Sequence, residues 1–213
     1  IVQLLTMTQN EPIAVPIFLA SFYGLRRSEL LGLRWSAIDF QNGWIHIETT
    51  VVKEKIGDRV VSTVRDGATK TESSRRSLPL CQYTYNYFSW LRQRQMTQMQ
   101  LCGACYNREY LDFVCVDEMG MLLQPDFVSQ KFQQILAKYG MRPIRFHDLR
   151  HSCATIMLYL NYTMKDVQQW LGHSNYNFTA NTYVHSSKQA QLQMAESLAD
   201  RLPAIGPVVT VEG

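Results

Sequence analysis

A short block of alternating residues limits the folds open to this chain. Across residues 44–52 apolar or β-branched side chains fall on every second position, and Asn42-Gly43 just before them marks a turn. This period of two indicates a half-buried strand. Residues 59–64 and 76–80 predict two further strands, and Pro79 places the last one at an edge or near its end. We expect one small three-stranded antiparallel sheet.

Most of the remaining chain shows the period of 3.6 residues that is typical of helices. The expected helices span residues 11–35, with a new helix starting near Arg26, and residues 83–99, 125–139, 147–159, 164–172 and 189–202. Thr163 and Asp166 are spaced as a capping box, and Gly172 is placed to end the same helix. Residues 113–116 predict one more short strand. The fold class is therefore mainly α with a small antiparallel sheet (α+β).

Composition excludes several classes of protein. Of the 213 residues 46% are hydrophobic and 18% are charged, which suits one domain with a sizeable core rather than a disordered chain. The net charge of +3 permits a polyanionic partner without demanding one. Apolar runs stay short of the ~20 residues that a membrane span needs. The five cysteines offer only Cys102-Gly-Ala-Cys105 as a close pair, so reduced thiols are expected rather than a zinc site.

Two pairs of residues suggest functional side chains, and the first of them suits a phosphate site. His147 and Arg150 lie three residues apart on an expected helix, so both side chains can face one ligand. Imidazole and guanidinium together suit an anionic oxygen. Arg26 and Glu29 have the same spacing, and an arginine at a helix start opposes the helix dipole, which suggests a functional role.

Four separated segments together resemble a known family. They are residues 23–33, residues 69–79, residues 147–152, and Leu171-Gly-His173 followed ten residues later by Tyr183-Val-His. Their content and order resemble the catalytic domain of the tyrosine recombinases, the phage integrase family. The resemblance covers roughly residues 12–202, and its first arginine box is most similar to that of mobile-element integrases.

The resemblance implies the tyrosine recombinase catalytic-domain fold over residues 1–202, including the last helix, with an irregular tail at 203–213. In this family the last helix commonly docks on a neighbouring subunit. Because the chain begins at Ile1 rather than Met, we expect it to be a piece of a longer protein with N-terminal DNA-binding domains outside it.

The resemblance also assigns the site. Tyr183 would be the nucleophile, with Tyr176 as a rival that its spacing and context disfavour. The expected catalytic residues are Arg26, Lys70, His147, Arg150, His173 and Tyr183. Two arginines can clamp the phosphate, His147 can act as base and Lys70 can protonate the leaving 5′ oxygen. The residues expected to orient these catalytic side chains, without contacting the DNA themselves, are Glu29, Asp148 and His151.

The implied function is site-specific cleavage and rejoining of DNA through a 3′-phosphotyrosyl intermediate, for excision and integration of a mobile element. It needs no cofactor, metal or ATP. The expected partners are double-stranded DNA with recombination sites, a homo-tetramer assembled on it and an accessory directionality protein, with no membrane. The expected location is the cytoplasm, with a bacterial or phage-encoded protein acting on the chromosome.

Other classes of protein are also compatible with the sequence. His147 and His151 have the i,i+4 spacing of a metal-dependent hydrolase, although no glutamate follows His147 and no third ligand is evident. Residues 155–173 could belong to a non-enzymatic DNA-binding module, which would not need Tyr183. Type IB topoisomerases share the chemistry, but the Lys70 loop and the box spacings resemble an integrase more closely.

Overall fold

The computed structural model describes residues 1–67, 75–172 and 188–202. Its helices are α1 (Val2–Met7), α2 (Ala14–Phe22), α3 (Arg27–Gly32), α4 (Gln82–Cys102), α5 (Pro125–Lys138), α6 (Asp148–Tyr159), α7 (Met164–Leu171) and α8 (Lys188–Ala199), with short 3-10 turns η1 (Trp35–Ala37) and η3 (Gly103–Cys105). Its strands are β1 (Ile38–Asp39), β2 (Trp44–Ile47), β3 (Thr49–Ile56), β4 (Arg59–Asp66) and β5 (Arg76–Pro79). The mainly helical class with small antiparallel sheets is confirmed.

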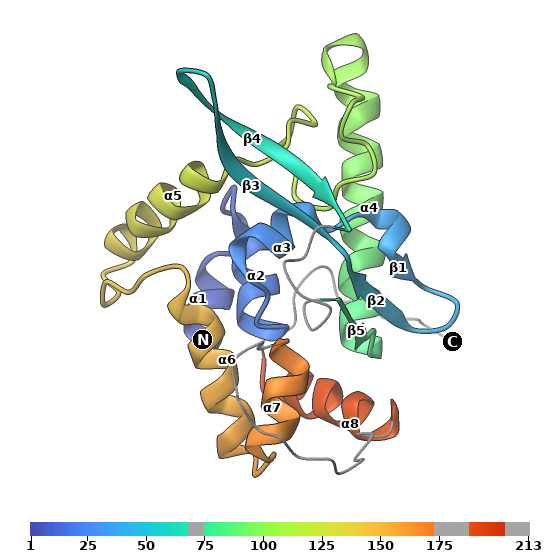
Figure 1. The fold of residues 1–213 in the computed structure, drawn as a ribbon, viewed down its shortest axis with the longest axis vertical. Coiled ribbons are helices and arrows are strands. Elements are labelled where there is room, and N and C mark those ends of the chain that lie inside the picture. The colour runs from blue at the N-terminus through green and yellow to red at the C-terminus, as the bar shows by residue number, and fades with distance from the viewer. Residues whose placement is uncertain (68–74, 173–187, 203–213) are drawn as a thin grey trace.

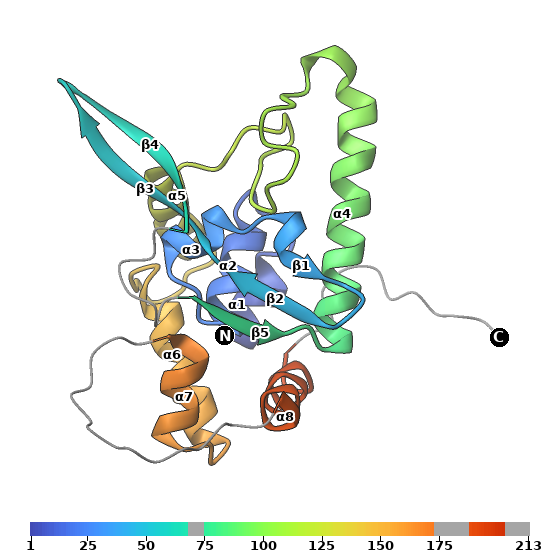
Figure 2. The same cartoon turned by 45° about the vertical axis from the view of Figure 1, so that its right-hand side comes forward.

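The strands are divided differently from the expectation. The described strands form a three-stranded sheet in the order β1-β2-β5 and a separate two-stranded ribbon, β3-β4, all antiparallel. The expected strand over residues 44–52 is interrupted at Glu48, after which the chain changes partner from β5 to β4. A three-stranded antiparallel sheet is thus present, but β1 replaces the predicted strand over residues 59–64, which pairs with β3 in the ribbon. The alternating pattern continues across Glu48 and does not indicate which strand lies alongside. The ribbon projects away from the body in both views (Figures 1 and 2).

Helix α2 lies at the centre of the core. Its residues from Pro16 to Phe22 are all buried, and it packs against α3 and α6. Phe18 stacks on Phe22 and contacts Tyr87 of α4 at 4.2 Å between ring centroids. Gly24, two residues after the end of α2, has a φ of +63°, a conformation that glycine adopts without strain. The expected helical region 11–35 is therefore split, and the turn after α2 delivers Arg26 to the start of α3.

Two further expectations can be compared with the structure. Residues 113–116 form isolated bridges, Arg34 with Phe113 and Val116 with Leu122, rather than the predicted strand. That segment is apolar because it is buried in a loop, and its length is too short to separate the two cases from sequence. Helix α7 has the predicted caps: Thr163 and Asp166 form the capping box, and Gly172 takes the left-handed conformation at the C-cap.

The last helix packs on its own domain. Met194, Ala195 and Leu198 of α8 are buried, and the helix contacts β5 and α4. The Tyr162 hydroxyl, in the loop between α6 and α7, donates to Ser197 Oγ at 3.3 Å. In the described structure α8 lies against β5 and α4 of its own chain. Docking of the last helix on a neighbouring subunit, which the resemblance implies, stays a prediction. Of the helices described, none is both long and apolar enough to cross a bilayer.

Candidate active site

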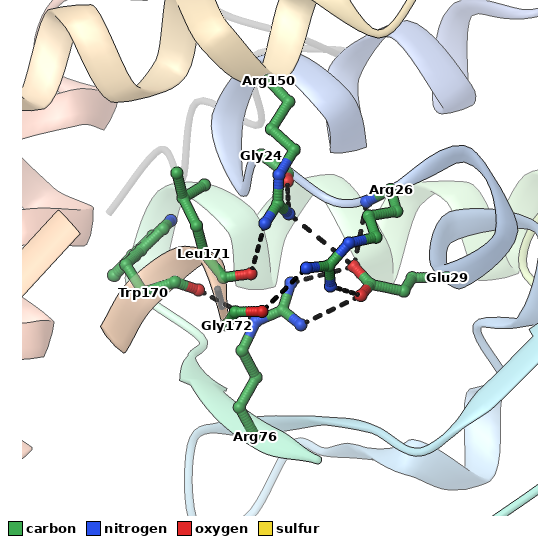
Figure 3. Close-up of polar contacts among 8 residues, drawn as sticks. All are labelled: Gly24, Arg26, Glu29, Arg76, Arg150, Trp170, Leu171 and Gly172. Carbon is green, nitrogen blue, oxygen red and sulfur yellow. Dashed lines mark hydrogen bonds and ion pairs between the residues drawn. The ribbon is translucent and has the colours of Figure 1, made fainter. Parts of the chain in front are cut away.

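Three arginines from separate elements meet around one carboxylate. Arg26 is the N-cap of α3, Arg76 is the first residue of β5 and Arg150 lies in the first turn of α6. Their guanidinium groups converge on Glu29 of α3 (Figure 3). Residues that are far apart in the chain therefore form one positively charged cluster with a single acid inside it.

Glu29 is the centre of this cluster. Its side chain is 2% exposed and accepts from the backbone N–H of Arg26 at 2.9 Å, from the Arg26 Nη1 and from Arg76 Nη1 and Nη2 at 3.2 and 3.0 Å. Arg150 Nη1 lies 4.0 Å from Glu29 Oε2. Burial alone would raise the pKa of the Glu29 carboxyl, but the charge and hydrogen bonds of Arg76, with those of Arg26, outweigh it and leave that pKa below its ordinary value. Glu29 is thus an ionised bridge between arginines.

The same three arginines hold the end of α7. The carbonyl oxygens of Trp170, Leu171 and Gly172 accept in turn from Arg76 Nε at 2.9 Å, from Arg150 Nη2 at 2.7 Å and from Arg26 Nη2 at 2.8 Å. These are carbonyls that a helix C-terminus leaves without partners, at the negative end of its dipole. Three successive orphan acceptors are therefore each satisfied by a different guanidinium, as the dashed lines in Figure 3 show.

Arg150 is the deepest of the three. Its side chain is 2% exposed, and its Nη1 donates to the Gly24 carbonyl at the end of the α2 turn. Burial, with the nearby charge of Arg26, lowers the pKa of Arg150 to about 10. The group is still protonated at neutral pH, and the buried charge is compensated by Glu29 and two carbonyl dipoles.

His147 stands at the exposed entrance to the cluster. It is the N-cap of α6, and its ring centroid lies 5.1 Å from that of His151 at an interplanar angle of 90°. Partial burial lowers the pKa of His147, and the charges of His151 and Arg150 lower it further. A neutral imidazole at neutral pH can accept a proton. Over the described ranges, no set of three His, Cys, Asp or Glu side chains is arranged to hold a metal ion.

Asp148 and His151 occupy the flank of the site. In the described structure the Asp148 carboxylate binds Arg145, through its Nη2 at 2.9 Å and its backbone N–H at 2.8 Å. Of the side chains expected to support the arginines, Glu29 therefore contacts Arg26 and Arg76, while Asp148 binds Arg145. His151 is exposed, one turn beyond His147 on the same face of α6.

A basic groove opens in front of Arg26 and His147. It has a volume of about 620 Å³ and runs between α3, β3, α5 and the start of α6. Its lining is Arg26, Arg27, Ser28, Val51, Val52, Lys53, Pro125, Ser129, Gln133, Arg145, Phe146 and His147. Arg27 closes one side by donating to the Pro125 carbonyl and to Ser129 Oγ, and Lys53 pairs with Asp126. The concave, cationic wall suits a polyanion.

The predicted residues are therefore brought together in part. Arg26 and His147 share the groove wall, and Arg150 and Glu29 lie in the network that holds Arg26. Lys70, His173 and Tyr183 lie outside the described residues, as does the rival Tyr176.

Arg76 is the contributor that sequence reasoning missed. A signal was available, because Arg76 and Leu78 are two residues apart on a strand and must point to the same face. Leu78 is 1% exposed and the Arg76 side chain 7%, so that face is the buried one. An Arg-Arg pair after a polar loop is nevertheless typical of a solvent-exposed cluster, and Arg75, the first residue of the pair, is indeed exposed.

Comparison with known proteins defines the class. The family model described as "Phage integrase family" matches residues 1–190, and the chain belongs to this family.

Individual relatives extend the comparison. The "Tyrosine recombinase XerC-like" protein of Caldanaerobacter subterraneus subsp. tengcongensis is 31% identical over 191 residues, which cover 86% of this chain and 48% of the relative. The ICEBs1 integrase of Bacillus subtilis is 26% identical over 182 residues, or 84% and 46% of the two chains. The chain thus spans about half the length of these relatives.

Solved structures share the fold. The Tn1549 transposon integrase in complex with circular intermediate DNA superposes with a TM-score of 0.66 at 22% identity, over 92% of this chain and 64% of the other. XerA recombinase superposes with a TM-score of 0.56 at 16% identity, over 93% and 61%. At these identities the likeness establishes the fold, and the chemistry depends on the site.

Proposed function

We propose that the protein is a tyrosine-type site-specific DNA recombinase, which cuts and rejoins DNA strands through a 3′-phosphotyrosyl intermediate. The observation that carries the proposal is the meeting of Arg26, Arg76 and Arg150 around Glu29 at the last turn of α7. That turn directly precedes His173 in the sequence, and Tyr183 follows ten residues later. A cationic cluster is thereby joined to the segment that bears the expected nucleophile.

The arrangement of Arg26 suits a phosphate in the groove. Its side chain is 31% exposed, and its described bonds to Glu29 and Gly172 use only some of the five N–H donors of a guanidinium. Donors are left over for the non-bridging oxygens of a phosphodiester. In phosphoryl transfer these oxygens carry much of the negative charge, so fixed cations around them lower the barrier.

The proposed reaction forms one bond to phosphorus and breaks another, with a proton transfer at each. The Tyr183 hydroxyl oxygen attacks phosphorus, and its proton passes to His147, whose lowered pKa keeps it neutral beforehand. The bond from phosphorus to the 5′ oxygen breaks, and that oxygen takes a proton from Lys70. The product is a 3′-phosphotyrosyl link and a free 5′ hydroxyl. Because the link retains the energy of the phosphodiester, attack by a 5′ hydroxyl of a second strand reverses the steps without ATP.

The partners follow from the same proposal. Double-stranded DNA bearing recombination sites would lie along the groove, since Arg27, Lys53 and Arg145 extend its basic lining beyond Arg26. The Tn1549 integrase structures contain DNA, and the ICEBs1 relative is named an integrase. These names support excision and integration of a mobile element. A homo-tetramer on DNA, an accessory directionality protein and action on the chromosome in the cytoplasm complete the proposal.

A strand-joining assay on full-length protein tests this function. Joining of labelled DNA carrying the recombination site is expected to continue in excess chelator, to stop in Tyr183→Phe and to continue in Tyr176→Phe. Loss of joining with chelator would instead support a metal-dependent hydrolase. Joining that survives Tyr183→Phe would overturn the proposal, and DNA binding with no joining in the wild type would favour a non-enzymatic DNA-binding module.

A further inference from the structure

Arg76 joins three elements through one guanidinium. From its place on β5 it donates to both oxygens of Glu29 on α3 and, through Nε, to the Trp170 carbonyl on α7. The side chain is 7% exposed and does not belong to the lining of the basic groove. In the described structure Arg76 is therefore placed behind Arg26 rather than facing the groove.

Arg76 holds both anchors of Arg26. The side chain of Arg26 is fixed by two acceptors, a Glu29 oxygen and the Gly172 carbonyl (Figure 3). Arg76 binds the same carboxylate and, two residues before Gly172, the same helix end. Without Arg76 the carboxylate could rotate and the last turn of α7 would lose one of its three tethers, so both acceptors of Arg26 could shift.

The geometry requires arginine at this position. A planar guanidinium presents two parallel N–H groups to a carboxylate and a third N–H from Nε in the same plane. The ammonium of lysine is a single nitrogen, which can reach Glu29 or the Trp170 carbonyl but cannot reproduce the paired bonds to both. Charge alone should therefore not replace Arg76.

We propose that Arg76 is a positioning residue of the strand-transfer site, which acts through Arg26 by fixing Glu29 and the end of α7. This inference rests on the proposed function. If Arg76 acts through Arg26, a change at Arg76 should slow the reaction only on DNA whose phosphate carries the negative charge that Arg26 would neutralise. A residue that merely supported folding would affect all substrates alike.

The test uses full-length Arg76→Lys and Arg76→Gln, with Arg108→Gln on the exposed loop after η3 as a control for loss of one charge. Single-turnover formation of the covalent adduct is measured on nicked suicide DNA with either a normal phosphate or a methylphosphonate at the cleavage position. The methylphosphonate replaces a charged oxygen by a methyl group and so removes the charge that Arg26 would neutralise. Unfolding midpoints and DNA affinities are measured in parallel.

On normal DNA both Arg76 variants should react about 100-fold more slowly, the size of effect expected from a misplaced catalytic group. On methylphosphonate DNA their deficit relative to wild type should fall to within about threefold, and DNA affinity should change less than about threefold on both. Arg108→Gln should match the wild type. An equal deficit on both DNAs, or wild-type rates in Arg76→Lys, would overturn the inference.

A double-mutant cycle covers the case in which Arg76→Gln does not fold. If Arg76 acts through Arg26, adding Arg76→Lys to Arg26→Ala should slow adduct formation no further, because coupled residues are not additive. Fully multiplicative effects would overturn the inference. Absence of any adduct from the wild type would instead count against the proposed recombinase activity, so the two failures are distinguishable.

Discussion

Arg26 Nη2 donates to the carbonyl oxygen of Gly172 at 2.8 Å, across 146 positions of sequence. This bond joins the start of α3 to the end of α7. The contact therefore links Arg26, which lines the groove, to the residue that directly precedes His173 in the sequence.

Glu29→Gln should strongly destabilise the fold. The amide keeps the shape of the side chain but removes the negative charge among three guanidinium groups, two of them largely buried. Breaking a buried ion pair by removal of one partner costs about 3 kcal/mol or more. Urea unfolding should record this loss, whereas Asp58→Asn in the exposed β3–β4 turn should leave the free energy of unfolding nearly unchanged. A Glu29→Gln protein as stable as wild type would show that the cluster does not need its carboxylate.

Gly24→Ala should disturb the site through Leu171. A Cβ at Gly24 would lie 2.3 Å from Leu171 Cδ2, and the φ of +63° adds a backbone penalty of about 1–2 kcal/mol for a non-glycine residue. Gly57→Ala is a matched control, because it has φ of +61° and no atom within 4 Å of the added Cβ. The loss in free energy of unfolding should be clearly larger for Gly24→Ala. Because the Gly24 carbonyl accepts from Arg150, the rate of DNA strand joining should fall in this variant too. Equal losses in the two variants would mean that the contact with Leu171 is unimportant.

Thr163→Ala should weaken α7 at its start. The Thr163 hydroxyl accepts from the Asp166 N–H at 3.2 Å, and its backbone N–H donates to the Asp166 carboxylate at 3.0 Å. Loss of such a cap costs about 1 kcal/mol. Thr155→Ala on α6 removes a hydroxyl whose described hydrogen bond goes back to the His151 carbonyl, and should change stability by less than about 0.5 kcal/mol. The denaturant midpoints of the two variants should be compared. Equal midpoints would contradict a stabilising role for the Thr163 cap.

The pH dependence of adduct formation should report His147. Its pKa in the folded protein is below the ordinary value of about 6.5. A base must be neutral, so the rate should rise with pH through a midpoint below that value and be level at neutral pH. His151→Gln removes one charge that lowers this pKa and should move the midpoint to higher pH. A midpoint above 6.5, or one that His151→Gln shifts to lower pH, would contradict the assignment of His147 as base.

Local chemistry explains which parts of the fold were predictable. The caps of α7 could be read from Thr163, Asp166 and Gly172, because capping involves residues within one turn. The change of strand partner at Glu48 could not, since both partners lie elsewhere in the chain. Pairing is decided by tertiary contacts that a period of two does not encode.

The same limit applies to the site. Arg26, Glu29 and Arg150 could be proposed from helical spacing and from the resemblance. Alternation with Leu78 could place Arg76 on the buried face of its strand. Its partners, Glu29 and the Trp170 carbonyl 94 residues away, could not be inferred from neighbouring residues. Asp148 shows the converse: its spacing from Arg145 favours the local ion pair that the structure contains. The described contacts of Arg150 are instead with Glu29 and with the carbonyls of Gly24 and Leu171.

The central claim is that Tyr183 forms a covalent bond with DNA under the control of this arginine cluster. The most direct measurement is a mass-spectrometric map of the adduct formed by the full-length protein on nicked suicide DNA in excess chelator. We expect a 3′-phosphotyrosyl adduct on the peptide containing Tyr183, absent in Tyr183→Phe and retained in Tyr176→Phe. An adduct on another residue, or one that needs a divalent metal, would contradict it.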